Sequence, residues 1–307
     1  MLRTFFVRLS ENRRLRHFAE SSSLGQAVSH RFVAGTEISD AVSATEAVNR
    51  AGMSVTIDNL GENVTNPDEA RQSAELYRQI LDAIAVKKLN ANISLKLTHM
   101  GLDVDEKLAQ DIVADLVRKA AAMTSGFVRV DMEGSPYTQR TLDFVHQLHR
   151  MPGNQGKVGA VIQAYLLRSE SDVEKLLSEG IRIRLCKGAY KEPATIAFAD
   201  KADVDANYLK LMKILLKSGV YHGLATHDEK IIRAAQAFAT QEKIACDSFE
   251  FQMLYGIRRD LQQRLVRDGW RMRVYIPFGT EWYPYFMRRL GERPANALFI
   301  LRNLLRK

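Results

Sequence analysis

The feature that most constrains the fold of this chain is a repeated alternation of short β-rich runs with longer helical patterns. Eight runs rich in β-branched and aromatic residues are separated by stretches with helical periodicity. The runs are Ser54–Leu60, Asn92–Leu97, Phe127–Met132, Val158–Leu166, Arg182–Ala189, Tyr221–Thr226, Ser248–Leu254 and Met272–Phe278. Strands joined by helices pair in parallel through right-handed crossovers, so we predict an α/β fold, a (β/α)8 TIM barrel.

The helical patterns between these runs support the same architecture. They include Asp68–Leu89, Asp105–Met123, Thr138–Arg150, Glu170–Ser178, Val204–Lys217 and Glu229–Thr240. An open doubly wound sheet is the alternative, since it uses the same alternation. The length of 307 residues would allow two domains, but no composition shift or linker interrupts the chain after Ser54. We therefore expect residues 1–35 to form an N-terminal helical arm and residues 36–307 to form one barrel domain.

The N-terminal arm carries basic residues among apolar ones. Its arginines are Arg3, Arg8, Arg13, Arg14 and Arg16. Such a segment could lie on a membrane as a basic amphipathic helix, act as a targeting peptide, or dock onto the barrel with its arginines in water. Docking is favoured because apolar stripes are mostly core contacts. Glu11 and Glu20 argue against a transit peptide, which is normally poor in acids.

Composition narrows the class of protein further. No apolar run approaches the ~20 residues of a membrane span, which favours a soluble protein. The two cysteines, Cys186 and Cys246, are too few for a disulfide framework and favour a reducing cytoplasm. A net charge of +8 is compatible with nucleic acid, an anionic lipid surface or an acidic small molecule as partner. We predict a cytoplasmic location and leave open a peripheral contact with the inner membrane.

Polar and charged residues gather where the predicted strands end. These ends are Asp58 to Glu62, Lys96 to Thr98, Asp131 to Glu133, Gln163 to Tyr165, Arg184 to Tyr190, Thr226 to Asp228, Glu250 to Gln252, and Tyr275. A barrel places its chemistry at the C-terminal ends of its strands. Burying such side chains without partners would cost several kcal/mol each, so they must pair with one another, with a ligand, or with both.

The motifs of several enzyme classes are missing. The chain has no GxxxxGK, no GxGxxG after a strand, no His-Glu-x-x-His, no Cys/His cluster with zinc spacing and no Gly-x-Ser-x-Gly elbow. Hydrolase and metalloprotease chemistry therefore lack support, and we expect no metal.

The last predicted strand leads into the most distinctive segment of the chain. The β-rich run stops at Pro277, and an aromatic helix begins near Trp282. That helix carries Arg288, Arg289 and Glu292 on adjacent turns. Two guanidinium groups beside a strand end are suited to bidentate binding of a small carboxylate.

Several of these segments together match one known family. They are Lys96-Leu97-Thr98, Val130-Asp131-Met132-Glu133, Gln163-Ala164-Tyr165-Leu166, Arg184-Leu185-Cys186-Lys187-Gly188-Ala189-Tyr190 and Tyr283-x-x-x-x-Arg288-Arg289-x-x-Glu292-Arg293. In this order they resemble the proline dehydrogenases, both the single-function bacterial enzymes and the corresponding domain of the bifunctional proline utilisation A proteins. The resemblance runs from about Thr36 to the C-terminus. It departs from the family pattern at Cys186, where valine is common.

The resemblance implies a distorted (β/α)8 barrel that binds FAD. It implies an oxidoreductase that converts L-proline to Δ1-pyrroline-5-carboxylate by hydride transfer to the flavin. Electrons would then pass to quinone, in the first step of proline catabolism. The implied partners are L-proline and quinone, and no nucleic acid.

The resemblance also implies how the substrate is held. Lys96, Arg288 and Arg289 resemble the clamp on the proline carboxylate, where each charge-assisted contact is worth about 1.5–3 kcal/mol. Glu292, one turn further on, would hold the two arginines in place. Glu62 resembles a gate residue that pairs with Arg288 across the pocket and excludes water.

Other residues resemble the walls of the pocket and the cofactor contacts. Arg184 resembles the residue that hydrogen-bonds the flavin near N5, where a positive charge stabilises the reduced ring. Asp131 resembles a partner that orients Lys96 or a pocket arginine. The residues expected to bind the cofactor are Gln163, Arg184, Lys187, Gly188, Ala189, Tyr190, Thr226 and His227. The apolar walls of the substrate pocket are Leu185, Tyr190 and Tyr275. The catalytic residues are Lys96, Asp131, Arg184, Tyr275, Arg288, Arg289 and Glu292. A phenol at Tyr275 would crowd a 4-hydroxyl and so favour proline over hydroxyproline.

Two other functions compete with this interpretation. A flavin-dependent barrel resembling methylenetetrahydrofolate reductase would lack the arginine clamp and would need a folate-binding face, which the sequence does not reveal. A basic nucleic-acid-binding protein would place its cations on one surface with aromatic rings for stacking. Here the cations are scattered along helices or lie at strand ends opposite acids.

Overall fold

The structure is a computed structural model that describes residues 31–123, 126–285 and 287. Most of the predicted N-terminal arm lies outside these residues, and so do the predicted site residues Arg288, Arg289 and Glu292. The division of the chain at residue 35 therefore stays a prediction.

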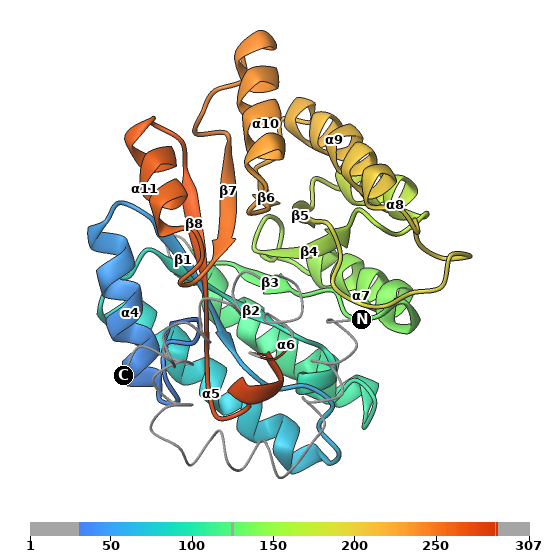
Figure 1. The fold of residues 1–307 in the computed structure, drawn as a ribbon. Coiled ribbons are helices and arrows are strands. Elements are labelled where there is room, and N and C mark those ends of the chain that lie inside the picture. The colour runs from blue at the N-terminus through green and yellow to red at the C-terminus, as the bar shows by residue number, and fades with distance from the viewer. Residues whose placement is uncertain (1–30, 124–125, 286, 288–307) are drawn as a thin grey trace, which may run out of the picture.

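The centre of the molecule is a closed barrel in which the strands β1 to β8 pair in sequence order, all in parallel (Figure 1). The strands are β1 (Ser54–Asn59), β2 (Ala91–Leu95), β3 (Val128–Val130), β4 (Val158–Gln163), β5 (Arg182–Cys186), β6 (His222–Ala225), β7 (Phe249–Leu254) and β8 (Met272–Phe278). The pairing of β1 with β8 closes the barrel and leaves no open edge.

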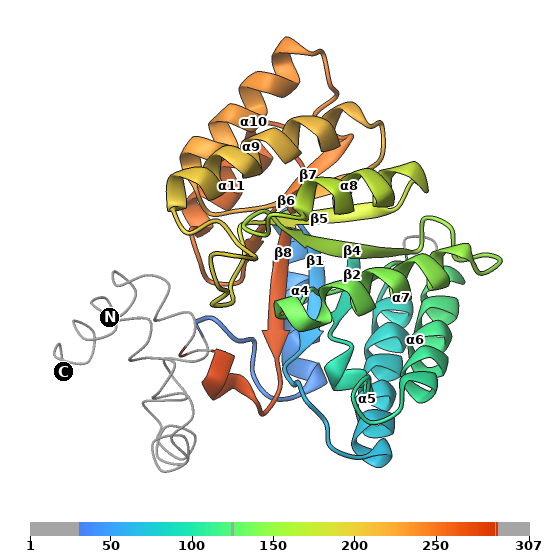
Figure 2. The same cartoon turned by 90° about the vertical axis from the view of Figure 1, so that its right-hand side faces the viewer.

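Helices surround this barrel and connect its strands. They are α5 (Pro67–Val86), α6 (Glu106–Ala121), α7 (Thr138–Arg150), α8 (Ser169–Ser178), α9 (Lys201–Lys217), α10 (Glu229–Gln241) and α11 (Arg259–Arg267), with short 3-10 turns η1 (Thr98–Met100) and η2 (Ser135–Tyr137). An additional helix, α4 (Ile38–Arg50), precedes β1 and packs against β1 and β8. In Figure 2, α9, α10 and α11 lie on one side of the strands, and α5, α6 and α7 lie on the other.

Local sequence explains where several helices begin. The Asn66 side chain accepts hydrogen bonds from two backbone N–H groups at the start of α5, and Pro67 fills the first helical position, where no N–H is needed. Asp105 caps α6 in the same way, and Asp228 caps α10. Each of these helix starts follows the C-terminal end of a strand, so the caps also fix the loops that surround the predicted site.

The two faces of each strand have different chemistry. On the outer face, residues such as Ile57, Leu95 and Ile183 are fully buried against the inner faces of the helices. Alternation along the strands turns the other residues into the barrel interior. Most TIM-barrel interiors are filled by Val, Ile and Leu. This interior instead holds buried polar residues: Thr56, Asp58, Asn92, Ser94, Arg129, Gln163, Arg184, Glu250 and Gln252.

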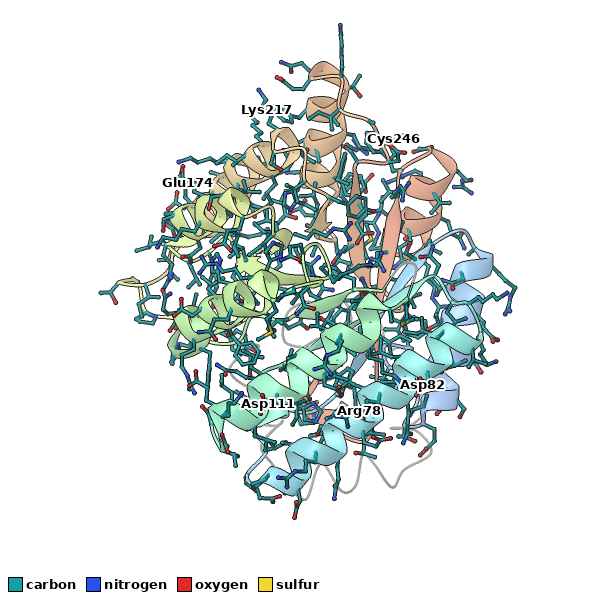
Figure 3. The ribbon with its side chains drawn as sticks, turned by 180° about the vertical axis from the view of Figure 1, so that it is seen from behind. Arg78, Asp82, Asp111, Glu174, Lys217 and Cys246 are labelled. Carbon is teal, nitrogen blue, oxygen red and sulfur yellow. The ribbon has the colours of Figure 1, made fainter. Side chains whose placement is uncertain are left out.

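The outside of the helical layer is charged. Figure 3 shows Arg78 and Asp82 on α5, Asp111 on α6, Glu174 on α8 and Lys217 on α9 at the surface. Ion pairs join neighbouring helices here, for example Arg78 Nε with Asp115 Oδ2 at 2.8 Å. Within the described ranges, no helix is both long and apolar enough to cross a membrane.

The predicted architecture is confirmed, and the open-sheet alternative is wrong because β1 pairs with β8. The predicted bounds of β8 and of α7 agree with the structure. The run Arg182–Ala189 was predicted too long, since β5 ends at Cys186. The residues after Cys186 form a loop because Gly188 turns the chain with a positive φ of 120°.

Candidate active site

Arg184 lies at the centre of the C-terminal half of the barrel. Its Nη1 donates to Asp131 Oδ1 at 2.7 Å and to Ser94 Oγ at 3.2 Å, and its Nε donates to Gln252 Oε1 at 2.6 Å. These partners come from β2, β7 and the residue that follows β3, so the arginine on β5 spans the interior. Its Nη2 has no hydrogen-bond partner among the residues that the structure describes.

Asp131 gathers groups from three other strands. Besides Arg184, its carboxylate accepts from Ser94 Oγ at 2.6 Å and from the Tyr275 hydroxyl at 2.9 Å. The guanidinium carbon of Arg184 lies 5.2 Å from the centre of the Tyr275 ring, a cation–π distance. Burial and the nearby carboxylate of Asp131 raise the pKa of Tyr275 well above its usual value, so the phenol stays protonated and donates. Asp131 therefore holds both Arg184 and Tyr275 by hydrogen bonds.

Lys96 lies next to a different carboxylate. Its Nζ is 4.0 Å from Asp58 Oδ2, and Asp58 Oδ1 accepts from the Tyr77 hydroxyl at 3.2 Å. Burial raises the pKa of Asp58 to about 6, because desolvation of the carboxylate, together with the like charge of Asp131, outweighs the stabilising charge of Lys96. Near pH 6, this side of the site therefore holds a cation beside a carboxyl group that is only partly ionised.

A second polar layer lies deeper in the barrel. Glu250 accepts from Arg273 Nε at 2.6 Å, from the Tyr221 hydroxyl at 2.9 Å and from Gln252 Nε2 at 2.6 Å. Arg129 is held nearby by the carbonyl oxygens of Ala160 and Arg182, at 2.9 and 2.6 Å. Every charged group in this layer thus has a partner of opposite charge or a carbonyl oxygen, as a buried charge requires.

The ends of β4 and β5 form one wall of the site. Gln163 donates to the Glu133 carbonyl oxygen at 3.0 Å and accepts from the Ala189 N–H at 3.3 Å. Gly188 lies directly against the Tyr165 ring, where any side chain would overlap the ring. The chain after β5 is exposed at Gly188 and Ala189.

Lys187 and the turn after β6 lie further along this wall. Lys187 Nζ pairs with Asp228 Oδ2 at 2.9 Å and with Asp205. Thr226 Oγ1 accepts from the Asp228 N–H at 3.0 Å, and His227 Nε2 accepts from the Leu254 N–H at 3.0 Å. Lys187 therefore lies close to the N-terminus of α10. The positive end of a helix dipole there favours a bound anion.

A cavity of about 470 Å³ opens beside the end of β1, and Glu62, Lys96, His99 and Glu281 are among its lining residues. Glu62 lies on the loop between β1 and α5. Burial and the charge of Lys96 lower the pKa of His99 to about 4, so this imidazole is neutral. The expected pairing of Glu62 with Arg288 lies outside the described residues.

The structure brings most of the predicted residues together, but not all of them. Lys96, Asp131, Arg184 and Tyr275 share the barrel interior, whereas Leu185 follows Arg184 on β5 and faces the opposite way. Leu185 is fully buried in the apolar layer under the helices, and it therefore does not line the interior.

The sequence patterns place Asp58, Glu250 and Gln252 at strand ends but assign them no role in the network, and they do not reveal Ser94. Ser94, Asp58, Gln252 and Glu250 all hold a residue that was predicted, either directly or through one partner. A usable signal was present, because strict alternation places Ser94 on the same face as Lys96 and places Glu250 on the same face as Gln252. What the sequence did not contain was which strands face each other across the barrel.

The fold and the site define an α/β-barrel enzyme with a charged interior at the C-terminal ends of its strands. The family model for proline dehydrogenase matches residues 41–302. The chain belongs to the proline dehydrogenase family of oxidoreductases.

Relatives match along the whole chain. "Proline dehydrogenase 1" of Bacillus subtilis (strain 168) is 43% identical over 309 residues, which cover 100% of both chains. "Proline dehydrogenase 2" of the same organism is 39% identical over 305 residues, which cover 99% of both. The "Proline dehydrogenase" of Deinococcus radiodurans is 40% identical over 284 residues, which cover 91% of this chain and 90% of that one.

A solved structure has the same fold. Proline utilization A from Bdellovibrio bacteriovorus, inactivated by N-propargylglycine, is similar with a TM-score of 0.81 and 26% sequence identity. The match covers 87% of this chain but only 32% of that one, so this chain corresponds to about a third of the larger protein.

Proposed function

We propose that this protein oxidises L-proline to Δ1-pyrroline-5-carboxylate with FAD as the hydride acceptor, and that the electrons then pass to quinone. The observation that carries the proposal is the placement of Arg184 in a proline dehydrogenase barrel. It is anchored on two sides by Asp131 and Gln252, while its Nη2 remains available to a ligand. The proposed reaction would be the first step of proline catabolism.

The chemistry of the donor set fits FAD. The flavin edge needs hydrogen-bond donors and acceptors, which the Gln163 amide and Arg184 supply, and the pyrophosphate needs a cation, which Lys187 supplies. Further contacts are proposed for the exposed backbone at Gly188 and for Tyr190, Thr226 and His227, which lie at the same strand ends. When bound, FAD would supply the acceptor for the hydride.

The roles proposed for the other residues follow from their charge. Lys96 would bind the proline carboxylate together with Arg288 and Arg289, and Glu292 would hold these arginines in place. Its neighbour Asp58 keeps Lys96 at the barrel end without strongly neutralising it, since the carboxyl group is itself partly protonated near pH 6.

The substrate ring would lie against Tyr275 and Tyr190. Tyr275 is fixed by its hydrogen bond to Asp131 and by its contact with Arg184, so its ring forms a rigid wall. Closing the pocket would exclude water, a role that we propose for Glu62. The proposed location is the cytoplasm, with quinone reached at the inner membrane.

Spectroscopy of the purified protein tests this proposal. We expect a yellow protein with a flavin spectrum that bleaches when L-proline is added without oxygen, and whose colour returns when a soluble quinone is added. The variant Arg184→Ala should lose most of the bleaching rate, by about a hundredfold, since it removes a charge aimed at the reacting group. A colourless protein that does not bind FAD, or a flavin that proline does not reduce, would contradict the proposal.

A further inference from the structure

Gln252 is the one amide side chain among the described hydrogen-bond partners of Arg184. It lies on β7, it is 5% exposed, and its Oε1 accepts from Arg184 Nε at 2.6 Å. This hydrogen bond uses a different nitrogen of the guanidinium from the bond between Nη1 and Asp131. Hydrogen bonds at two different nitrogens fix the plane of a guanidinium, whereas hydrogen bonds at Nη1 alone allow it to turn about that nitrogen.

Glu250 fixes the orientation of the Gln252 amide. Its Nε2 donates to Glu250 Oε1 at 2.6 Å, so its oxygen is the atom that faces Arg184. Glu250 is itself held by Arg273 and Tyr221. Burial raises the pKa of Glu250, but the charge of Arg273 and these hydrogen bonds outweigh the effect and lower it overall. Glu250 thus stays ionised and accepts the hydrogen bond. A flip of the Gln252 amide would place its oxygen against the Glu250 carboxylate, and two acceptors repel each other.

The neighbouring strand leaves space for this amide. Gly223 on β6 pairs in register with Glu250, and a Cβ atom at Gly223 would overlap the carboxamide of Gln252. A strand residue without a side chain weakens the strand by itself, so a glycine here is consistent with a packing requirement of Gln252.

We propose that Gln252 is a positioning residue, which aims the Nη2 group of Arg184 at the flavin while Glu250 fixes the orientation of the Gln252 amide. The proposal rests on the proposed function, in which Arg184 contacts the flavin. Arg184 needs a defined plane because its positive charge stabilises the reduced ring only from the correct position. Loss of the amide leaves Asp131 and Ser94 to hold Nη1 alone, and the guanidinium turns away from the flavin.

The test compares Gln252→Met with Gln262→Met. Methionine keeps the length of the side chain but cannot accept the bond from Arg184. Gln262 is a matched control, because it is equally buried but its amide donates only to the carbonyl oxygens of Leu254 and Ile257. Both variants should lose thermal stability. Gln252→Met alone should lower the flavin midpoint potential, and it should slow flavin reduction by proline about ten- to a hundredfold, with a smaller change in proline affinity.

Gly223→Ala provides a second route to the same outcome. It removes no polar group but pushes the Gln252 amide aside, so the flavin potential and the rate of flavin reduction should fall as they do in Gln252→Met. An unchanged potential in the folded, flavin-loaded variants would overturn the proposal for Gln252 and leave the proposed function intact. Equal shifts in the Gln252 and Gln262 variants would also overturn it. Failure of the unmodified protein to bind flavin would instead contradict the proposed function.

Discussion

At the residue scale, this protein is distinguished by charged side chains that are buried and yet paired. Arg184 with Asp131, Arg273 with Glu250, and Lys96 with Asp58 occupy a space that apolar residues fill in most barrels. Such pairs are a poor source of stability, because the cost of removing charges from water rivals the attraction between them. Their presence is therefore better explained by binding than by folding.

Asp58 provides a prediction about pH. Burial raises the pKa of its carboxyl group to about 6, so Asp58 contributes stability that is fully present below its ordinary pKa and is lost as pH rises through about 6. At pH 7 this loss is roughly 2–3 kcal/mol. We expect Asp58→Asn to remove the fall in melting temperature between about pH 4 and pH 6, as measured by calorimetry.

Glu229→Gln is the control for the pH experiment. Hydrogen bonds from Arg233 and Arg258 lower the pKa of Glu229 to about 2, so Glu229 contributes stability that is fully present above its ordinary pKa and is lost as pH falls through about 2. Glu229→Gln should therefore leave the slope between pH 5 and 6 unchanged. If Asp58→Asn keeps the slope of the unmodified protein in that range, the carboxyl group of Asp58 is not the group that titrates there.

Tyr275 provides a prediction about specificity. Its ring is held in place by Arg184 and Asp131, so it cannot move aside for a 4-hydroxyl group on the substrate. We expect kcat/KM for L-proline to exceed that for trans-4-hydroxy-L-proline, and we expect Tyr275→Ala to reduce the ratio about tenfold, a change of about 1.4 kcal/mol. Tyr275→Phe keeps the ring and should keep the ratio. Comparable values for the two substrates in the unmodified enzyme would refute this role.

At the scale of elements, the strands and the loops that follow them have different roles in the site. The strands carry the groups that must not move, such as Arg184 on β5 and Gln252 on β7. The loops carry the group that we propose to open and close the pocket, Glu62 after β1. This division agrees with the general observation that rigid elements position a site while loops admit the substrate.

The loop after β1 provides a prediction about access. Glu62 lines the cavity next to Lys96, and we expect Glu62→Ala to raise KM for proline about five- to tenfold, because the pocket then closes less well. The limiting rate of flavin reduction in stopped-flow measurements should fall by less. Glu69→Ala is a suitable control, since Glu69 lines the same cavity but is bonded to Thr65. An unchanged KM in Glu62→Ala would argue against a gate.

At the scale of the whole molecule, closure of the barrel makes a polar interior possible. Residues from β2, β3, β5, β7 and β8 meet only because β1 pairs with β8 and brings the ends of the sheet together. The apolar core then lies outside the barrel, between strands and helices. The stability of the molecule therefore depends mainly on that outer layer, which leaves the interior free to bind.

Removal of the cofactor tests whether the fold depends on the outer apolar layer while the interior binds FAD. A ligand that binds only the folded state stabilises it by about 2.7 kcal/mol when its free concentration is 100 times its Kd. We expect the flavin-free protein to remain folded but to melt about 5 °C or more below the reconstituted protein in a calorimetric scan. Equal melting temperatures with and without FAD, at saturating FAD, would mean that the proposed site does not bind it.

The fold could be predicted from the sequence because its signals are local. Runs such as Met272–Phe278 differ in period and in β propensity from helices such as Thr138–Arg150, and both were located without error. The bounds were less certain where a strand leads into a polar loop, as after Cys186. There the chain leaves the sheet because of a turn at Gly188, which hydrophobic pattern alone does not reveal.

The sequence alone determined the barrel, its family and the residue types that gather at the strand ends, since periodicity and motif order are written along the chain. Only the tertiary structure decided which of these residues are partners. It paired Lys96 with Asp58, bonded Arg184 to both Asp131 and Gln252, and turned Leu185 away from the interior. The physical reason is that contacts across a closed barrel join strands far apart in sequence, and their register is set by the packing of the whole sheet rather than by any one segment.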